Sequence, residues 1–177
     1  MKYFLLFVII LSGTISCFAQ TTPKDQLSIG PEYGLAAGQI SSNYATVLGA
    51  SVKFELPVSA SQFNVTITGG ITNYLVKLDY HGVLPLSSIL YFPVELGGKY
   101  YFSKIAYVEG DAGVSFNANQ YYTGSKTAFI YAPIIGVTAP TNKHKAAIDL
   151  GLRYEGRVEN GVTVSQLALR LAYRFGI

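Results

Sequence analysis

The chain has 177 residues, a length that usually forms a single domain. Half of the residues are hydrophobic and only 13% are charged, and the 13 Lys and Arg side chains nearly balance the 10 Asp and Glu side chains. This balance argues against nucleic acid as a partner, because nucleic-acid binding needs a clear positive excess. Aromatic residues are abundant, with 14 Tyr and 10 Phe but no Trp.

Residues 1–19 have the order of a secretory signal peptide. Lys2 precedes an apolar run at 3–11, and small residues then lead to Ala19. We therefore expect cleavage after Ala19 and a single mature domain over residues 20–177. The apolar run is about half of the ~20 residues that a membrane-spanning helix needs, so a retained anchor is the weaker alternative.

Cys17 is the only cysteine of the chain. Once the leader is removed, the mature chain has no cysteine for a disulfide or a metal site. In the alternative of a lipoprotein, Cys17 would be the acylated first residue. Thr14, however, stands where a leucine usually precedes the modified cysteine by three places.

The rest of the chain shows a hydrophobic period of two. Between residues 89 and 102, for example, Phe92, Val94 and Leu96 alternate with Glu95 and Gly97. Such segments, each of about ten residues and separated by Gly, Ser, Asn, Thr and Pro clusters, predict eight strands. Their expected bounds are 27–36, 46–56, 63–73, 89–102, 105–116, 128–139, 146–155 and 164–176.

The charges within these strands distinguish a membrane barrel from a soluble sheet. None falls on an apolar face, where a charge at the middle of a bilayer would cost ~2–4 kcal/mol. The opposite face combines sparse charges of both signs with small residues, as the narrow lumen of an eight-stranded barrel requires. We therefore predict an all-β fold, an eight-stranded antiparallel up-and-down transmembrane β-barrel with a plugged lumen. The predicted lumen charge network is Glu32, Lys53, Glu55, Glu95, Lys99, Glu109, Asp111, Asp149, Arg153, Glu155, Arg170 and Arg174.

The connections between the strands predict the orientation of the barrel. Outer-membrane barrels have short periplasmic turns and longer outer loops, with both termini in the periplasm. We expect periplasmic turns at 57–62, at Ser103–Lys104, which would be a two-residue hairpin, and at 140–145. The expected outer loops are 37–45, 74–88, 117–127 and 156–163.

Loop 74–88 is the longest of these connections and contains several apolar residues. We expect its ends to extend the third and fourth strands; alternatively, it forms an interaction surface, with Lys77, Asp79, Tyr80 and His81 as candidate residues.

Aromatic residues gather near the expected strand ends, which favours interfacial girdles over ordinary strand propensity. The expected girdle residues are Tyr100, Tyr101, Phe102, Tyr107, Tyr121, Tyr122, Phe129, Tyr131, Tyr154, Tyr173 and Phe175.

Two strings resemble a known family. These are YFPVELGGKYYF at 91–102 and, after a short turn, YVEGDAG at 107–113. They are similar to the outer-membrane protein β-barrel domain family, including its PorT-like branch and small OmpX-like barrels. The ending LAYRF at 171–175 resembles the C-terminal signal that the barrel-assembly machinery reads, although Gly176 and Ile177 follow it. The resemblance implies a membrane barrel but no single shared activity.

The sequence offers little for catalysis. Hydrolytic triads need a base beside the nucleophile. The two histidines that could serve as this base, His81 and His144, fall at opposite ends of the expected barrel. Glu109 and Asp111 share a face, but we expect them to pair with lumen bases rather than with a metal ion, the candidates being Lys99, Arg153, Arg170 and Arg174. We therefore expect no enzyme, no cofactor and no metal site.

Three functions remain open from the sequence. The favoured one is a structural or interaction barrel in the bacterial outer membrane, in contact with membrane lipid and lipopolysaccharide, inserted by the barrel-assembly machinery and able to bind an envelope protein. One alternative is a PorT-like accessory of protein secretion. The other is a narrow channel or a small lipid-modifying enzyme, in which His81 would act near Ser87 or Ser88. A soluble lipocalin-like carrier is the rival fold.

Overall fold

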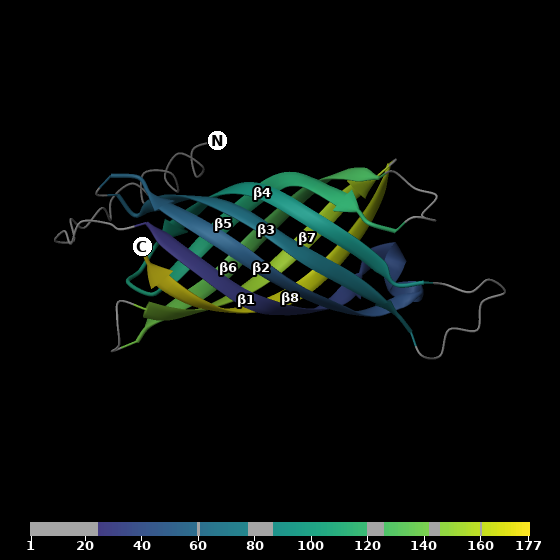
Figure 1. Ribbon diagram of the computed structural model, residues 1–177, viewed down its shortest axis with the longest axis horizontal. Coiled ribbons are helices and arrows are strands. Elements are labelled where there is room, and N and C mark those ends of the chain that lie inside the picture. The colour runs from purple at the N-terminus through teal and green to yellow at the C-terminus, as the bar shows by residue number, and fades with distance from the viewer. Residues whose placement is uncertain (1–24, 60, 78–86, 120–125, 142–145, 160) are drawn as a thin grey trace, which may run out of the picture.

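The computed structural model describes residues 25–59, 61–77, 87–119, 126–141, 146–159 and 161–177. Within them, strands follow one another in chain order around a closed antiparallel barrel (Figure 1). The strands are β1 (Gln26–Ala37), β2 (Tyr44–Pro57), β3 (Phe63–Val76), β4 (Ile89–Tyr101), β5 (Ala106–Asn117), β6 (Thr127–Pro140), β7 (Ala146–Glu159) and β8 (Val162–Gly176). The predicted eight-stranded up-and-down barrel is confirmed, because β1 pairs with both β2 and β8. The expected leader, its cleavage after Ala19 and Cys17 lie outside the described residues.

Side chains alternate between the two faces of the barrel wall. Leu96 is 62% exposed on the outer face, whereas its neighbour Glu95 is 1% exposed in the lumen. The same alternation runs through all the strands, so that large apolar residues cover the outside and charged residues are buried inside. This arrangement inverts that of a soluble barrel and matches the face assignment made from the sequence.

The barrel has two unlike ends. Ile177 N donates to Asp25 O at 2.9 Å, so the start of β1 and the end of β8 meet at one end, called here the terminal end. The opposite end, called here the loop end, holds a short 3-10 helix, η1 (Gly38–Ser42), between β1 and β2 (Figure 1). Among the described residues no helix is long and apolar enough to cross a membrane.

The predicted two-residue hairpin at Ser103–Lys104 is wrong. Residues 102–105 form a four-residue connection between β4 and β5, in which the Ser103 hydroxyl accepts a hydrogen bond from Ala106 N at 2.9 Å. Two-residue hairpins need positive backbone φ, which glycine or asparagine supplies and this sequence does not.

The predicted outer loop 156–163 is also wrong. β7 continues to Glu159 and β8 begins at Val162, which leaves two residues between the strands. Gly161 has a φ of +80°, the left-handed conformation that such a tight connection requires. The ends of loop 74–88 were expected to extend both neighbouring strands, and only the first does so. β3 extends to Val76, whereas β4 begins at Ile89, after the loop, and residues 78–86 lie outside the described residues.

Exposed aromatic side chains occur near both ends of the barrel, but the predicted girdle needs correction. Tyr107 is buried in the lumen, and Tyr101 reaches a lumen carboxylate, because inward positions near the strand ends also take aromatic residues. Tyr121 and Tyr122 lie outside the described residues. In the described part of the chain, the exposed aromatic residues are Phe63, Tyr100, Phe102 and Tyr173 toward the terminal end, and Tyr33, Phe92, Phe116, Phe129 and Tyr154 toward the loop end.

Candidate functional site: the charged lumen

The lumen is filled by polar and charged side chains from all eight strands. The structure places all twelve charges of the predicted network on this inner face, Glu32 and Arg174 being only slightly exposed. It adds Arg157 and Glu159 on β7, which the sequence analysis had placed in a loop. Arg157 and Glu159 follow Arg153 and Glu155 at every second position of the strand, so all four point inward. This period of two would have identified Arg157 and Glu159 as lumen residues.

Lys99 is the centre of one group of contacts. Its Nζ lies 3.0 Å from Glu55 Oε2 and 3.2 Å from Asp149 Oδ2. The Tyr107 hydroxyl donates to the other Asp149 oxygen at 2.7 Å, and its ring centroid is 3.8 Å from Lys99 Nζ. Arg174 joins the group through Glu55 and through the Tyr101 hydroxyl. We call this set the Lys99 group.

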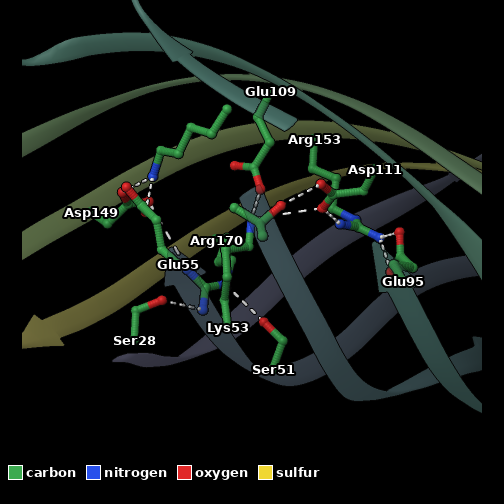
Figure 2. Close-up of polar contacts among 12 residues, drawn as sticks. Ser28, Ser51, Lys53, Glu55, Glu95, Glu109, Asp111, Asp149, Arg153 and Arg170 are labelled. Atoms are coloured by element: carbon green, nitrogen blue, oxygen red, sulfur yellow. Dashed lines mark hydrogen bonds and ion pairs between the residues drawn. The ribbon is translucent and has the colours of Figure 1, made fainter. Parts of the chain in front are cut away.

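Arg170 extends the Lys99 group along the wall formed by β8, β1 and β2. Its Nη1 lies 4.0 Å from Asp149, and its Nε donates to the Ser51 hydroxyl at 2.7 Å. Ser51 donates in turn to Glu32 at 2.5 Å. Figure 2 shows Arg170 between Ser28 and Ser51, and its Nη2 donates to the Ser28 hydroxyl at 3.1 Å.

Arg153 is the centre of the other group. It contacts three carboxylates, with distances of 2.6 Å to Glu95, 2.8 Å to Glu155 and 3.4 Å to Asp111. Figure 2 shows Arg153 beside Glu95 and Asp111. Lys53 lies 2.5 Å from Glu109 and 3.7 Å from Asp111, so it closes the group on the side of β2. We call this set the Arg153 group.

Arg157 continues the Arg153 group toward the loop end. Its Nη2 lies 2.5 Å from Glu155, and its Nη1 donates to the Tyr74 hydroxyl at 2.7 Å. The guanidinium also lies over the ring of Tyr91, 4.5 Å from the centroid. These aromatic rings belong to an inward cluster of Tyr44, Val47, Tyr74, Ile89, Tyr91 and Val164, against which Ile40 of η1 packs. Side chains therefore fill the loop end of the lumen, and the sequence analysis did not predict this role for the tyrosines.

Gly97 provides the space that the central carboxylates need. A Cβ at Gly97 would collide with the Asp111 carboxylate and would lie 2.6 Å from the Thr66 hydroxyl. Thr66 donates to Asp111 at 3.2 Å, so the glycine lets this hydrogen bond and the Arg153 contact form.

The pairing of Glu109 and Asp111 was only partly predicted. Arg153 contacts Asp111 as expected, but the base that contacts both carboxylates is Lys53, which was not among the predicted partners. Lys99, Arg170 and Arg174 contact other carboxylates instead. Within the described part of the chain, no group of three or more His, Cys, Asp or Glu side chains could hold a metal ion.

Most of the candidate interaction loop is not described. Lys77 is half-buried, and its backbone N donates to Asn43 O at 3.0 Å. Asp79, Tyr80 and His81, as well as His144, lie outside the described residues. Of the serines considered beside His81, Ser87 accepts a hydrogen bond from the Tyr44 hydroxyl at 3.0 Å through its carbonyl oxygen.

The barrel is similar to solved structures of small outer-membrane proteins. The outer-membrane protein Ail of Yersinia pestis in a phospholipid bilayer nanodisc has a TM-score of 0.57 and 18% identity, over 87% of this chain and 100% of Ail. Neisserial surface protein A has a TM-score of 0.61 and 12% identity, over 89% of this chain and 100% of its own. A crystal structure of Ail, the attachment invasion locus protein, with the heparin analogue sucrose octasulfate has a TM-score of 0.55 and 18% identity, over 87% and 100% of the two chains. At these identities the likeness establishes the fold. No protein-family model matches the chain, and no curated protein matches it.

Proposed function

We propose that this chain is an integral outer-membrane protein whose side-chain-filled barrel is a rigid support for outer loops that bind partners. The observation that carries this proposal is the apolar outer face around a lumen of paired charges, seen at Leu96 and Glu95. A bilayer accommodates such an outer surface, whereas in water it would be an aggregation surface. The similarity to barrels of the outer membrane and the neisserial surface supports this location.

Membrane fractionation tests the location. We expect the protein to stay with the membranes after sodium carbonate extraction. We also expect it to migrate differently on gels before and after boiling, because folded barrels resist detergent. Recovery in the soluble fraction, as for a lipocalin-like carrier, would contradict the proposal.

We further propose that the terminal end faces the periplasm and the loop end faces the outside. Single cysteines placed in a Cys17→Ser background at Lys104, near the terminal end, and at Lys126, near the loop end, distinguish the two orientations. A membrane-impermeant maleimide should label Lys126→Cys, and not Lys104→Cys, on intact cells. Both should be labelled after lysis, which controls for accessibility.

The lumen is proposed not to conduct ions. Its interior positions are taken by the Lys99 and Arg153 groups, and Arg157 and the tyrosines fill the loop end. Purified protein in planar bilayers should therefore show no conductance steps above those of the bilayer. Regular steps would instead favour the alternative of a narrow channel.

The outer loops are proposed as the binding region, with Lys77, Asp79, Tyr80 and His81 in loop 74–88 as first candidates. The attachment function in the name of Ail is consistent with such a role. Replacing residues 78–86 by a Gly/Ser linker should abolish binding to an envelope or host partner while heat-modifiable migration is retained. A matched replacement of 120–125 should leave that binding in place.

Two other functions predict different outcomes of the same work. A PorT-like secretion accessory, favoured by the resemblance at 91–113, would block protein export when deleted. A lipid-modifying enzyme would change the lipid mass spectrum and lose that effect in His81→Ala. We propose no catalytic activity, so we expect the protein to leave the lipid mass spectrum unchanged, and we expect no difference between the wild type and His81→Ala.

Membrane lipid and lipopolysaccharide are the proposed surroundings of the outer face, and the barrel-assembly machinery is the proposed partner during insertion. The end of β8, which includes Tyr173 and Phe175, pairs with β1 and so completes the barrel. Replacing both aromatic residues by alanine should slow assembly in cells more than folding into vesicles of short-chain phosphatidylcholine.

A further inference from the structure

The Lys99 and Arg153 groups are separate in their direct contacts. Among the described residues, no hydrogen bond or ion pair joins a member of one group to a member of the other. A small, mostly enclosed cavity lies between them. Its lining includes Glu32 and Ser51 of the Lys99 group together with Glu95, Arg153 and Glu155 of the Arg153 group.

A threonine hydroxyl in this cavity lacks a hydrogen-bond partner. Thr68 on β3 is 3% exposed, and its Oγ1 has no partner among the described residues. A buried hydroxyl without a partner has lost its hydrogen bonds to water and gained none, so such groups are usually satisfied by protein or by an internal water molecule. Within this cavity, the centre of a water molecule can occupy a volume of about 10 Å³. This is close to the space that a single water needs.

We infer that this cavity is a binding site for a single internal water molecule, which joins the two groups. The water oxygen accepts a hydrogen bond from the Thr68 hydroxyl, and the water donates one hydrogen bond to a carboxylate oxygen of Glu32 and one to a carboxylate oxygen of Glu95. This gives the water three polar partners, the usual number for a buried water. A small cation fits less well, because the guanidinium of Arg153 also lines the cavity and already pairs with Glu95 and Glu155.

The water completes a polar network along the lumen. On one side, Arg170 connects Glu32 and Ser51 to Asp149 and the rest of the Lys99 group. On the other side, Arg153 and Glu155 connect to Arg157 near the loop end. With the water in place, hydrogen bonds and ion pairs run without a break from Arg174 to Arg157.

A crystal structure at a resolution that shows bound waters tests this inference. We expect one density peak within hydrogen-bonding distance of Thr68 Oγ1 and of a carboxylate oxygen from each group. The variant Thr68→Val keeps the shape of the side chain but removes the hydroxyl, so the occupancy of this peak should fall at least twofold. Thr66→Val is the matched control, because the Thr66 hydroxyl already donates to Asp111, and it should leave the peak unchanged.

Other results would overturn the inference. These are an empty cavity in the wild-type protein, a direct contact between Glu32 and Arg153 that closes the cavity, or a peak whose short oxygen distances identify a cation. An unchanged peak in Thr68→Val would remove Thr68 as its ligand. If a variant fails to fold, transfer of magnetisation from water to the Thr68 amide of the wild-type protein in nanodiscs decides the matter, and its absence counts against the site.

Discussion

Arg153 on β7 and Glu95 on β4 are joined across the interior of the barrel. Nη2 of Arg153 lies 2.6 Å from one carboxylate oxygen of Glu95 and 2.7 Å from the other. The two strands are not neighbours in the wall, so the contact spans the lumen. The same guanidinium contacts Glu155 and Asp111, which makes Arg153 the cation shared by three buried carboxylates.

Replacing Arg153 by methionine should strongly destabilise the barrel. The change keeps much of the side-chain length but leaves Glu95, Glu155 and Asp111 without their common cation. Removing one partner of a buried ion pair costs about 3–5 kcal/mol. We expect a loss of this size in the free energy of unfolding, measured by urea titration in lipid vesicles with circular dichroism.

Glu95→Gln is the matched comparison for this change. It removes one carboxylate charge, but Arg153 keeps Glu155 and Asp111, and the glutamine oxygen still accepts a hydrogen bond. Its destabilisation should be clearly smaller than that of Arg153→Met. A larger loss for Glu95→Gln would show that Glu95, and not Arg153, organises the group.

Leu96→Arg should impair insertion into the bilayer. Leu96 lies on the outer face of β4, and a charge there at the bilayer midplane costs about 2–4 kcal/mol. Phe102→Arg on the same face lies just beyond the end of β4, where the cost falls to about 0–1 kcal/mol. Folding yield into vesicles, followed by heat-modifiable migration on gels, should separate the two variants. Equal yields would mean that Leu96 does not face the hydrocarbon.

The barrel could be predicted because both faces of each strand are constrained. Lipid excludes charge from positions such as Leu96 and Val94, and a narrow lumen excludes large apolar side chains from positions such as Glu95 and Gly97. A period of two therefore identifies strands and faces together. The register between paired strands, in contrast, determines which inward residues meet, and the sequence of one strand does not specify this register.

The contact of Lys53 is an example of a pairing that could not be predicted without the register. Lys53 pairs with Glu109, 56 residues away on a strand that is not its neighbour, and this contact depends on how all the intervening strands are staggered. Arg157 and Glu159 were missed for a different reason, because Gly156, Asn160 and Gly161 around them also indicate a loop. Tyr107 was assigned to the interfacial girdle, since strand ends attract aromatic residues on either face.

Gly97→Ala should destabilise the barrel, whereas Gly98→Ala on the opposite face should have a smaller effect. The new Cβ at Gly97 would displace the Asp111 carboxylate from its contacts with Arg153 and Lys53, and overpacking of this kind costs about 1–3 kcal/mol. At Gly98 the new Cβ meets only the far edge of the Phe63 ring, at 2.8 Å, on the outer face where the ring is able to turn toward lipid. Urea titration of both variants checks the order, and the reverse order would place Gly98 in the lumen.

Tyr107→Phe tests whether this tyrosine acts in the lumen or in the girdle. The Tyr107 hydroxyl donates to Asp149 at 2.7 Å, and hydrogen bonds to charged groups are worth about 1.5–3 kcal/mol. Its removal leaves Asp149 with Lys99 and Thr138, so we expect a loss within this range in the free energy of unfolding.

Tyr100→Phe is the matched control for this measurement. Tyr100 lies on the outer face of β4 near the same end and is 45% exposed, so losing its hydroxyl should change the free energy of unfolding by less than about 0.5 kcal/mol, as is usual for surface positions. A lumen role predicts that only Tyr107→Phe is costly, because only that hydroxyl satisfies a buried carboxylate. If both variants unfold like the wild type, Asp149 does not depend on Tyr107, and the aromatic ring beneath Lys99 rather than the hydroxyl holds this end of the network.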